Sequence, residues 1–439
     1  MGAARLGAWI GALSLSTAAC GGQVESFRAS PGGDDAGSAK QTAASGDAAP
    51  SHSSGFQGAD GGDARSATFE PDASRTARDA SDASDSEVAD AGGPDGDEAE
   101  AAPPPCTPCG PSCVDRSSDS LNCGACGHDC LGGACSLGQC QPFAIAMGQS
   151  DPWLIAVDDQ GVYWGDWRQD GGVIAQAPLD GGEAFVLAPA GTWPMGIATS
   201  STAIYWVAFD GTGMDGVWTA PRDGGPPVLL ASALNVGDGI ALDSDRVYWA
   251  DGAAIMAKAL DGGTATALAS GDFPTFLAVD GANVYWTDWG SAVDGGPADS
   301  GAVLAASLDG GAVRTMATGL EYPLGIAVDS AHVYWATRGA ADGSGTVAEA
   351  PLDGGPPVVL APGQLAPYTV ALDPDAVFWT DYSSGVSGGA WSVSLLGGAA
   401  AAPLPYASSV PFAIAVDSTS IYWTNLANPA SAAIMRLAK

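Results

Sequence analysis

Apolar and polar residues recur in one order seven times between residues 141 and 439. The copy at Pro323–Trp335 reads PLGIAVDSAHVYW. Its apolar run, Ile326–Val328, is typical of a buried strand and ends at an aspartate, which favours a turn. The β-branched and aromatic residues that follow favour a second strand. Each copy therefore predicts two short strands joined by a tight turn.

An aromatic residue followed by Trp marks the second strand of every copy. Consecutive pairs are 37–49 residues apart, a period typical of propellers and solenoids. The pairs are Tyr163-Trp164, Tyr205-Trp206, Tyr248-Trp249, Tyr285-Trp286, Tyr334-Trp335, Phe378-Trp379 and Tyr422-Trp423. A version of IAVD precedes each of them, at Ile155–Asp158, Ile197–Ser200, Ile240–Asp243, Leu277–Asp280, Ile326–Asp329, Val370–Asp373 and Ile414–Asp417.

The second half of each copy predicts a hairpin. Asp-Gly is a strong hairpin signal, and an apolar strand such as Val358–Ala361 comes after it. Asp-Gly-Gly turns begin at Asp180, Asp223, Asp261, Asp309 and Asp353. The sixth copy reads Leu396-Gly397-Gly398 instead, and the seventh ends before its turn. Four short antiparallel strands in units of this length are typical of propeller blades.

The two ends of the array complement each other. Phe143–Met147 matches the fourth strand of a copy, and Ala433–Leu437 matches the third strand of the last copy. Joining them in one sheet would remove exposed sheet edges. We therefore predict an all-β, seven-bladed β-propeller over residues 141–439, closed by one N-terminal and three C-terminal strands.

Loop lengths differ on only one side of the predicted propeller. A Pro, or Gly237 in its place, lies twelve residues before the Trp in all seven copies. The distance from Trp to Asp-Gly-Gly ranges from Trp249–Asp261 to Trp286–Asp309, so the variation falls between the second and third strands. These loops share one face with the loops that enter the inner strands; we name it the variable face. Because loops on rigid scaffolds carry function, we predict the binding surface there.

Large side chains surround the predicted start of each inner strand. At the mouth of a central channel they would stack on a sugar or hold a peptide; the alternative is that they plug the channel and cover the blade ends. These candidate ligand-binding residues are Trp153, Trp193, Met195, Phe273, Tyr322, Leu324, Tyr368 and Phe412.

The first 105 residues have a different composition. Residues 1–20 show the layout of a secretory signal, with Arg5, an apolar run from Leu6 to Leu15, and small residues before Cys20. The run is too short to remain as a transmembrane helix. Residues 21–105 are mainly Ala, Asp, Gly, Ser and Pro. Such a segment cannot bury enough apolar surface to offset chain ordering, so we predict a disordered acidic linker.

Residues 106–140 contain eight of the nine cysteines. They are Cys106, Cys109, Cys113, Cys123, Cys126, Cys130, Cys135 and Cys140. Two CxxC pairs are compatible with a zinc site. However, thiols oxidise outside the cytoplasm, and an even number of cysteines in a small segment predicts disulfides. The pairing stays open, because eight cysteines allow 105 combinations.

Charge and missing motifs restrict the function. A formal net charge of −35 disfavours nucleic acid and anionic membrane surfaces as partners. The clusters Asp288/Asp294/Asp299 and Asp210/Asp215 offer oxygen ligands for weak Ca²⁺ binding, but no EF-hand loop is present. We expect no cofactor.

We also find no catalytic constellation or nucleotide-binding motif. The array has a single histidine, His332, in the turn after an inner strand. Asp151 and Asp238 are the polar exceptions at an otherwise apolar channel mouth. These features predict a protein without enzymatic activity.

Three segments resemble known families. Ala-Ala-Cys at Cys20 resembles a bacterial lipobox, which implies lipidation of that cysteine and, with Gly21 next, an outer-membrane or cell-surface location. The cysteine-rich segment resembles modules of secreted myxobacterial surface proteins. YWTDWG at Tyr285–Gly290, together with the IAVD and DGG segments, resembles the YWTD repeats of LDL-receptor-type propellers. That family normally builds six blades, whereas this chain has seven copies.

The YWTD resemblance implies that the motif's aspartate bonds to backbone between strands. The aspartate is present at Asp166, Asp251, Asp288 and Asp381 and is replaced by Ala208, Thr337 and Asn425. Together these features predict a non-catalytic, lipid-anchored surface protein that binds a protein, peptide or glycan. The alternatives are a lactonase-like propeller hydrolase or lyase with a divalent metal at the channel mouth, and a structural envelope protein.

Overall fold

The computed structural model describes residues 106–439, except for residues 192, 210–214, 233–235, 292–297, 340–342, 383–387, 398–399, 406–409 and 427–431. The predicted signal segment, Cys20 and the linker lie outside the described residues, as do Asp210 and Asp294. Within the described part, no helix has the length and hydrophobicity needed to cross a membrane.

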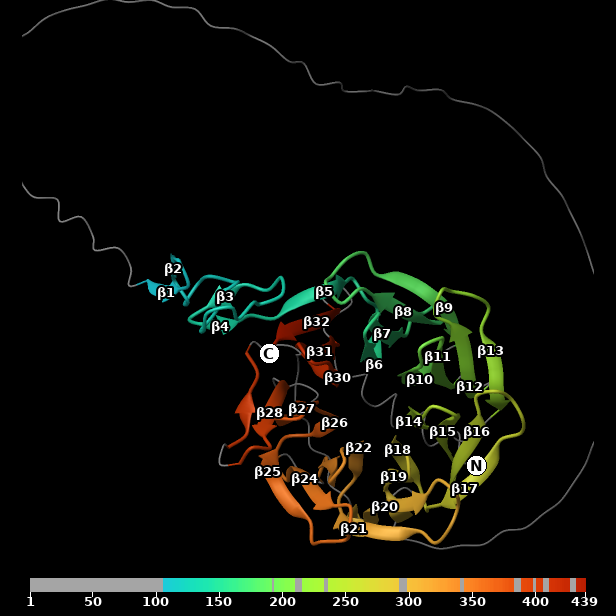
Figure 1. The fold of residues 1–439 in the computed structure, drawn as a ribbon. Helices are drawn as coiled ribbons and strands as arrows, with labels where there is room; N and C mark the ends of the chain where they lie inside the picture. The colour runs from blue at the N-terminus through green and yellow to red at the C-terminus, as the bar shows by residue number, and fades with distance from the viewer. Residues whose placement is uncertain are drawn as a thin grey trace, which may run out of the picture. The chain divides into compact units, whose positions relative to one another are not determined.

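Seven four-stranded antiparallel sheets surround a common axis, as Figure 1 shows. Blade 1 comprises β6 (Pro152–Asp158), β7 (Gly161–Asp166), β8 (Gly172–Ala177) and β9 (Phe185–Gly191). Blade 2 comprises β10 (Trp193–Thr199), β11 (Ala203–Phe209), β12 (Gly216–Pro221) and β13 (Val228–Ser232). Blade 3 comprises β14 (Val236–Leu242), β15 (Arg246–Asp251), β16 (Ala254–Ala259) and β17 (Thr266–Ser270).

The remaining blades continue in chain order. Blade 4 comprises β18 (Pro274–Val279), β19 (Asn283–Asp288), β20 (Gly301–Ser307) and β21 (Arg314–Leu320), with a 3-10 turn at Ala298–Ser300. Blade 5 comprises β22 (Pro323–Val328), β23 (His332–Thr337), β24 (Gly345–Pro351) and β25 (Val358–Gln364). Blade 6 comprises β26 (Pro367–Leu372), β27 (Ala376–Asp381), β28 (Gly389–Ser394) and β29 (Ala402–Pro403).

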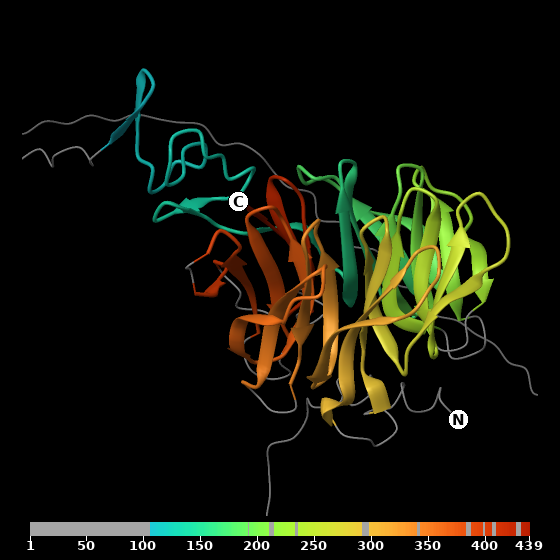
Figure 2. The same cartoon turned by 60° about the horizontal axis from the view of Figure 1, so that its bottom comes forward.

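Blade 7 is built from both ends of the array, which confirms the predicted closure. It comprises β30 (Pro411–Val416), β31 (Ser420–Asn425), β32 (Ala433–Ala438) and β5 (Phe143–Met147). Strand β5 runs antiparallel to β32, with Met147 opposite Ala433 and Phe143 opposite Arg436. Figure 2 shows the blades standing side by side around the axis. The closure leaves the ring without an open first or last blade.

The repeated aromatic-Trp pair is the centre of each blade. All seven tryptophans of the pairs are at most 1% exposed. In blade 4, the Asp280 carboxylate accepts the backbone N–H groups of Ala282 and Asn283 at 2.8 and 2.7 Å, and the Tyr285 hydroxyl at 2.8 Å. Burial and this carboxylate raise the pKa of Tyr285 to about 12. The IAVD aspartate thus fixes both the turn and the tyrosine, and Tyr248–Asp243, Tyr334–Asp329 and Tyr422–Asp417 repeat the bond.

Each inner strand is interrupted near its start. The pairing with the second strand shifts register between the proline and the first residue of IAVD in all seven blades. In blade 3 the paired residue is Val236 rather than Gly237. A shift of this kind leaves residues out of the ladder. The Thr of YWTD bonds some of the freed carbonyls of the next blade: Thr287 donates to Leu324 and Thr380 to Phe412, both at 2.7 Å.

The aspartate of YWTD holds the loop that enters the same blade. Asp166 Oδ1 accepts the backbone N–H groups of Ser150 and Asp151 at 3.0 and 2.9 Å. Asp288 accepts those of Asp272 and Phe273, both at 2.9 Å. Both aspartates are at most 2% exposed. Their role is structural, as the resemblance to YWTD repeats implied.

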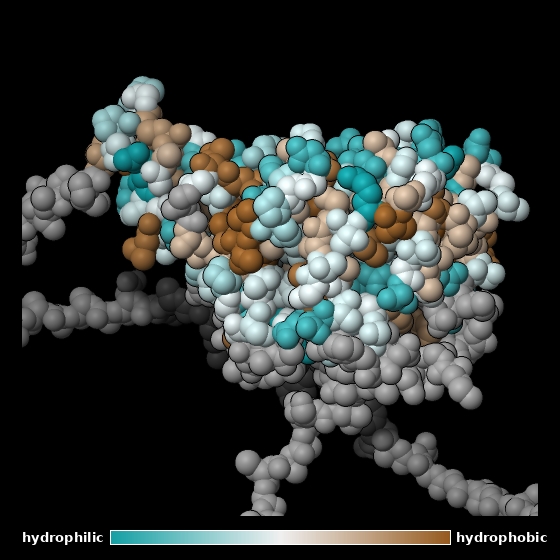
Figure 3. Space-filling model, turned by 90° about the horizontal axis from the view of Figure 1, so that it is seen from below, coloured by the Kyte–Doolittle hydropathy of each residue, from teal (hydrophilic) through white to brown (hydrophobic). Residues whose placement is uncertain are grey.

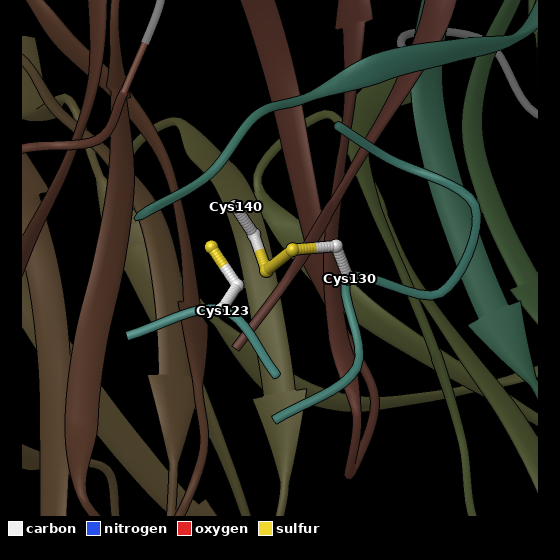
Figure 4. A group of neighbouring side chains, drawn as sticks. All are labelled: Cys123, Cys130 and Cys140. Carbon is white, nitrogen blue, oxygen red and sulfur yellow. A yellow bond between two sulfur atoms is a disulfide. The ribbon is translucent and has the colours of Figure 1, made fainter. Parts of the chain in front are cut away.

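The cysteine-rich segment has two small hairpins, β1 (Thr107–Cys109) with β2 (Ser112–Val114), and β3 (Cys135–Ser136) with β4 (Gln139–Cys140). All eight cysteines form disulfides, as predicted. The pairs are Cys106–Cys113, Cys109–Cys126, Cys123–Cys135 and Cys130–Cys140. Cys123, Cys130 and Cys140 are buried together (Figure 4). Cys123 is bonded to Cys135, and Cys130 is bonded to Cys140. Because disulfide sulfurs are not thiolates, this segment does not provide the four thiolates that a zinc site needs.

The cysteine-rich segment packs against blade 7. Its buried cysteines share an apolar cluster with Trp423 and Leu437. The His128 ring joins the two parts: Nδ1 lies 2.7 Å from the Cys123 carbonyl oxygen, and Nε2 lies 2.6 Å from Lys439 O. The segment is therefore attached to the propeller by polar as well as apolar contacts.

The side of the propeller carries apolar patches separated by polar surface, as Figure 3 shows. Several outer strands begin with apolar residues that are about half exposed: Phe185, Val186, Val228, Leu229, Val358 and Val359. These residues lie outside the predicted binding face.

Candidate functional site

Five of the eight predicted residues directly follow the proline of an inner strand: Trp153, Met195, Leu324, Tyr368 and Phe412. Three of them meet at the channel. The Phe412 ring centroid lies 4.8 Å from that of Trp153 and 4.4 Å from that of Tyr368. Leu324 is 4% exposed, and its cluster includes Tyr368. These residues come from blades 1, 5, 6 and 7, so they connect blades around the channel.

Two residues that the sequence did not single out complete this group. Phe276 lies edge-on to Tyr368 at 5.8 Å, and Tyr382 lies edge-on to Phe412 at 5.3 Å. We name Trp153, Phe276, Tyr368, Tyr382 and Phe412 the channel cluster. Phe276 and Phe412 are buried, whereas the other three are half-buried. The rings thus cover part of the channel and still leave some aromatic surface accessible.

Trp193 and Met195 belong to a separate group in blade 2. Trp193 stacks on Phe209 at 6.1 Å and lies 5.7 Å from Trp167 of blade 1. Met195 is buried, while Trp193 and Trp167 are half-buried. The predicted residues therefore form several aromatic groups rather than one continuous ring.

Phe273 and Tyr322 form a third group through Trp289. Trp289 stacks on Phe273 at 5.7 Å, and Tyr322 meets it edge-on at 6.0 Å. The Trp289 indole N–H donates to the Pro323 carbonyl at 2.8 Å. We name Phe273, Trp289 and Tyr322 the rim platform. All three are half-buried.

The backbone of the rim platform is strained at Tyr322. Its φ is +57°, a left-handed conformation that L-residues with bulky side chains rarely adopt. Among the described residues, only Leu131 and Leu137 share this property outside glycine, and both lie in the cysteine-rich segment. Strain of this kind is concentrated at functional sites, where the surrounding structure maintains it.

A cavity of about 130 Å³ lies in the channel next to the channel cluster. Its lining includes Leu154, Gly196, Asp238, Gly239, Phe276 and Gly325. Three of these are glycines, and a Cβ added at Gly196, Gly239 or Gly325 would come within 2.4–2.7 Å of backbone in the next blade. Close approach of neighbouring inner strands therefore requires glycine at these positions.

Among the described residues that line this cavity, only Asp238 is ionisable. The Tyr368 hydroxyl donates to its Oδ2 at 3.2 Å. Burial raises the pKa of Asp238 to about 6, and the hydrogen bond from Tyr368 opposes this rise. Burial and the Asp238 carboxylate raise the pKa of Tyr368 well above its usual value. At neutral pH the pair is therefore a carboxylate and a neutral phenol.

Asp151, the second polar exception, lies beside Trp153. Burial raises its pKa, the Trp153 side chain lowers it, and the Asp166 charge raises it further. The Asp151 charge in turn contributes to the raised pKa of Tyr382, after burial. Negative charge therefore acts on the channel cluster from both Asp151 and Asp238.

Those remaining candidates that the structure describes do not come together into a site. Asp288 is used to hold backbone, Asp299 is exposed, and Asp215 is buried. His332 lies at the start of β23, 6.0 Å from the Tyr334 ring. Among the described residues, the only group of three metal-ligand side chains at metal-binding distances is Cys123, Cys130 and Cys140.

Sequence reasoning missed three aromatic residues for which a signal existed. Trp167, Trp289 and Tyr382 each follow the aspartate of a YWTD copy directly. In that position the backbone N–H bonds to the residue before the inner-strand proline, as in Trp289 N–H to the Phe273 carbonyl at 3.0 Å. An aromatic residue there is thus placed beside the predicted ring. The sequence could therefore have predicted Trp289, the third member of the rim platform, because Trp289 directly follows Asp288.

Known proteins resemble the chain in structure only. No protein-family model matches it, and no curated protein matches its sequence. A virginiamycin B lyase from Staphylococcus aureus superposes with a TM-score of 0.52 at 14% identity, covering 68% of this chain and 98% of the lyase. A puromycin-hydrolysing peptidase from Mycobacterium tuberculosis gives 0.52 at 17% identity, covering 66% of this chain and 51% of the peptidase.

A nidogen/laminin complex is also among the similar structures. It shares 21% identity over 52% of this chain and 84% of that chain, with a TM-score of 0.38. The likenesses to the lyase and to the peptidase show the propeller fold alone.

Proposed function

We propose that the protein is a non-catalytic binding protein that recognises a protein, peptide or glycan on its variable face. The rim platform is the observation that carries this proposal. Trp289 is anchored by its indole N–H, and Tyr322 is held in a strained backbone conformation beside it. Both rings remain half-exposed.

Rigid aromatic side chains suit recognition. Tyr and Trp provide large contact areas with few rotatable bonds, and they dominate many binding hot spots. Their flat faces stack on sugar rings or peptide side chains. The second group, Trp167 with Trp193, offers a similar surface between blades 1 and 2. The proposed ligand contacts these two groups and the exposed parts of Trp153 and Tyr368.

The proposed location is the bacterial cell surface. An export signal and lipidation at Cys20 would anchor the chain, and residues 21–105 would separate the propeller from the membrane. The four disulfides fit an oxidising compartment. The negative charge fits a soluble exterior rather than direct contact with anionic lipid.

A glycan and peptide array probed with the full exported chain tests this function. We expect at least one class to bind, and Trp289→Ala to weaken binding about tenfold or more. Phe185→Ala is the control, because Phe185 is a 50% exposed aromatic residue at the start of outer strand β9, away from the rim platform. Equal loss with both variants, or unchanged affinity with Trp289→Ala, would overturn the site. Failure of every class to bind would favour the structural envelope alternative.

The alternative proposal is a hydrolase or lyase acting at the channel, and Asp238 favours it. A carboxyl group with a pKa of about 6 is suited to general acid–base work near neutral pH. The lyase and the peptidase with similar folds also make an enzyme conceivable. However, the described residues supply no second carboxylate or histidine for a metal beside Asp238. Turnover of lactones or cyclic peptides that Asp238→Asn abolishes would establish this alternative.

A further inference from the structure

We infer that the central channel binds the ammonium group of a small organic cation, with Asp238 as its counter-ion and the rings of Phe276 and Tyr368 beside it. This inference deepens the proposed binding function by naming a ligand class for the channel. It rests on an unbalanced charge, on the rings next to it and on the size of the cavity.

The Asp238 carboxylate has no cationic partner among the residues that the structure describes. Salt bridges between described residues involve Asp158, Asp166 and Asp373, but not Asp238. The Tyr368 hydroxyl that donates a hydrogen bond to it is neutral at physiological pH. Asp238 is half-buried, and partial withdrawal of a carboxylate from water is costly unless the charge is paired. A bound cation would supply the missing positive charge.

Rings of the channel cluster lie next to the carboxylate, which Tyr368 contacts directly. Phe276 lines the same cavity, and its ring lies 5.8 Å from that of Tyr368. Tyr368 in turn contacts Phe412 at 4.4 Å. The negative face of an aromatic ring attracts cations, and this attraction increases when water is excluded. Rings combined with one carboxylate are the chemistry that recognises alkylammonium groups.

The size of the cavity limits the ligand. A volume of about 130 Å³ accommodates a compact head group but not a complete sugar chain or peptide. The other charged groups near the channel cluster are Asp151, which adds negative potential, and Arg338, whose charge acts on Tyr368 and Tyr382. Arg338 is exposed, so solvent screens its charge more strongly than that of Asp238.

Calorimetric titration of the full exported chain with choline tests the inference. The comparison ligand is 3,3-dimethyl-1-butanol, which has the same shape without the charge. We expect one choline per chain, and binding of the neutral alcohol at least tenfold weaker. Asp238→Asn should weaken choline binding at least tenfold and remove the discrimination. Asp261→Asn, which removes an exposed charge from the turn between β16 and β17, should leave both unchanged.

Two further outcomes separate this inference from the proposed function. Tyr368→Phe keeps the ring and frees the carboxylate, so choline affinity should be retained or increased. Equal affinity for choline and the alcohol, absence of choline binding, or equal losses with Asp238→Asn and Asp261→Asn would overturn the ammonium site. The array result with Trp289→Ala would then still decide the binding role of the rim platform. If Trp289→Ala does not weaken binding on the array while the discrimination between choline and the alcohol persists, the channel site is supported and the rim platform is not.

Discussion

The Tyr368 hydroxyl of blade 6 reaches across the channel and donates a hydrogen bond of 3.2 Å to Asp238 of blade 3. The two residues are 130 positions apart in the chain and three blades apart in the ring. Both lie inside an inner-strand register shift, Asp238 between Val236 and Ile240 and Tyr368 between Pro367 and Val370, where the ladder leaves residues unpaired. The same irregularity in all blades therefore positions polar and aromatic side chains at the centre of the propeller.

The Asp238 carboxyl should make stability depend on pH. Burial raises its pKa to about 6 in the folded protein, whereas an unfolded aspartate titrates near its ordinary value of about 3.9. Between these values the folded state holds a proton that the unfolded state has released, so stability falls as pH rises through this window. Asp238→Asn cannot ionise and should escape this fall, gaining on the order of 3 kcal/mol relative to the native chain.

Urea unfolding of both proteins at several values between pH 4 and pH 7 measures this difference. The two stabilities should be similar at pH 4 and should diverge towards pH 7. Asp261→Asn controls for the loss of one charge at an exposed position. A difference between native chain and Asp238→Asn that stays constant with pH would contradict the raised pKa.

Blade closure by β5 gives a second prediction. Ile145 is 5% exposed and belongs to the core cluster shared by blades 1 and 7, whereas Met147 on the same strand is 78% exposed. Ile145→Ala should destabilise the propeller by about 2–5 kcal/mol, because it leaves a cavity in the core. Met147→Ala should change stability by less than about 0.5 kcal/mol. Denaturant unfolding followed by tryptophan fluorescence compares them, and similar effects would argue against a closing role for β5.

The architecture could be predicted because every copy carries the sequence signals for its own strands and turns. In Pro323–Trp335, the buried run, the turn aspartate and the aromatic pair each follow from residue type and spacing. Closure was predictable because Phe143–Met147 matches a fourth strand that the last copy lacks. Neither step requires knowledge of distant contacts.

The contacts at the site were not predictable in the same way. The repeat places Asp238 and Tyr368 at one level of the channel, but their bond depends on the ring's width and on side-chain rotamers. The separation of Phe273 and Tyr322 into a platform with Trp289 depends on the backbone at Tyr322. The disulfide pairing depends on loop conformations that spacing alone leaves open.

The buried disulfide should matter more than an exposed one of similar length. Cys130–Cys140 is buried against blade 7 with a sequence separation of 10, whereas Cys106–Cys113 is exposed with a separation of 7. Loop entropy differs between them by only a few tenths of a kcal/mol. Replacing both cysteines of Cys130–Cys140 with serine should therefore lower the melting temperature by several degrees more than the same change at Cys106–Cys113. Equal shifts would show that contact with blade 7 contributes nothing.

The left-handed backbone at Tyr322 predicts an unusual order of stabilities. At an ordinary strand position alanine is more stable than glycine by about 0.5–1 kcal/mol. At Tyr322, with φ of +57°, alanine retains the steric conflict and glycine does not. Tyr322→Gly should therefore be more stable than Tyr322→Ala by about 1 kcal/mol. Both variants lose the ring that contacts Trp289, so the difference between them isolates the backbone.

Parallel urea unfolding of the two variants checks this order. Thr318, a residue of β21 without a positive φ, supplies the reference pair. Alanine should exceed glycine at Thr318 and fall below it at Tyr322. If alanine is the more stable at both positions, the strain at Tyr322 is absent in solution. If the order reverses only at Tyr322, the platform is held at a cost in stability, and weaker ligand binding by both variants would connect that cost to recognition.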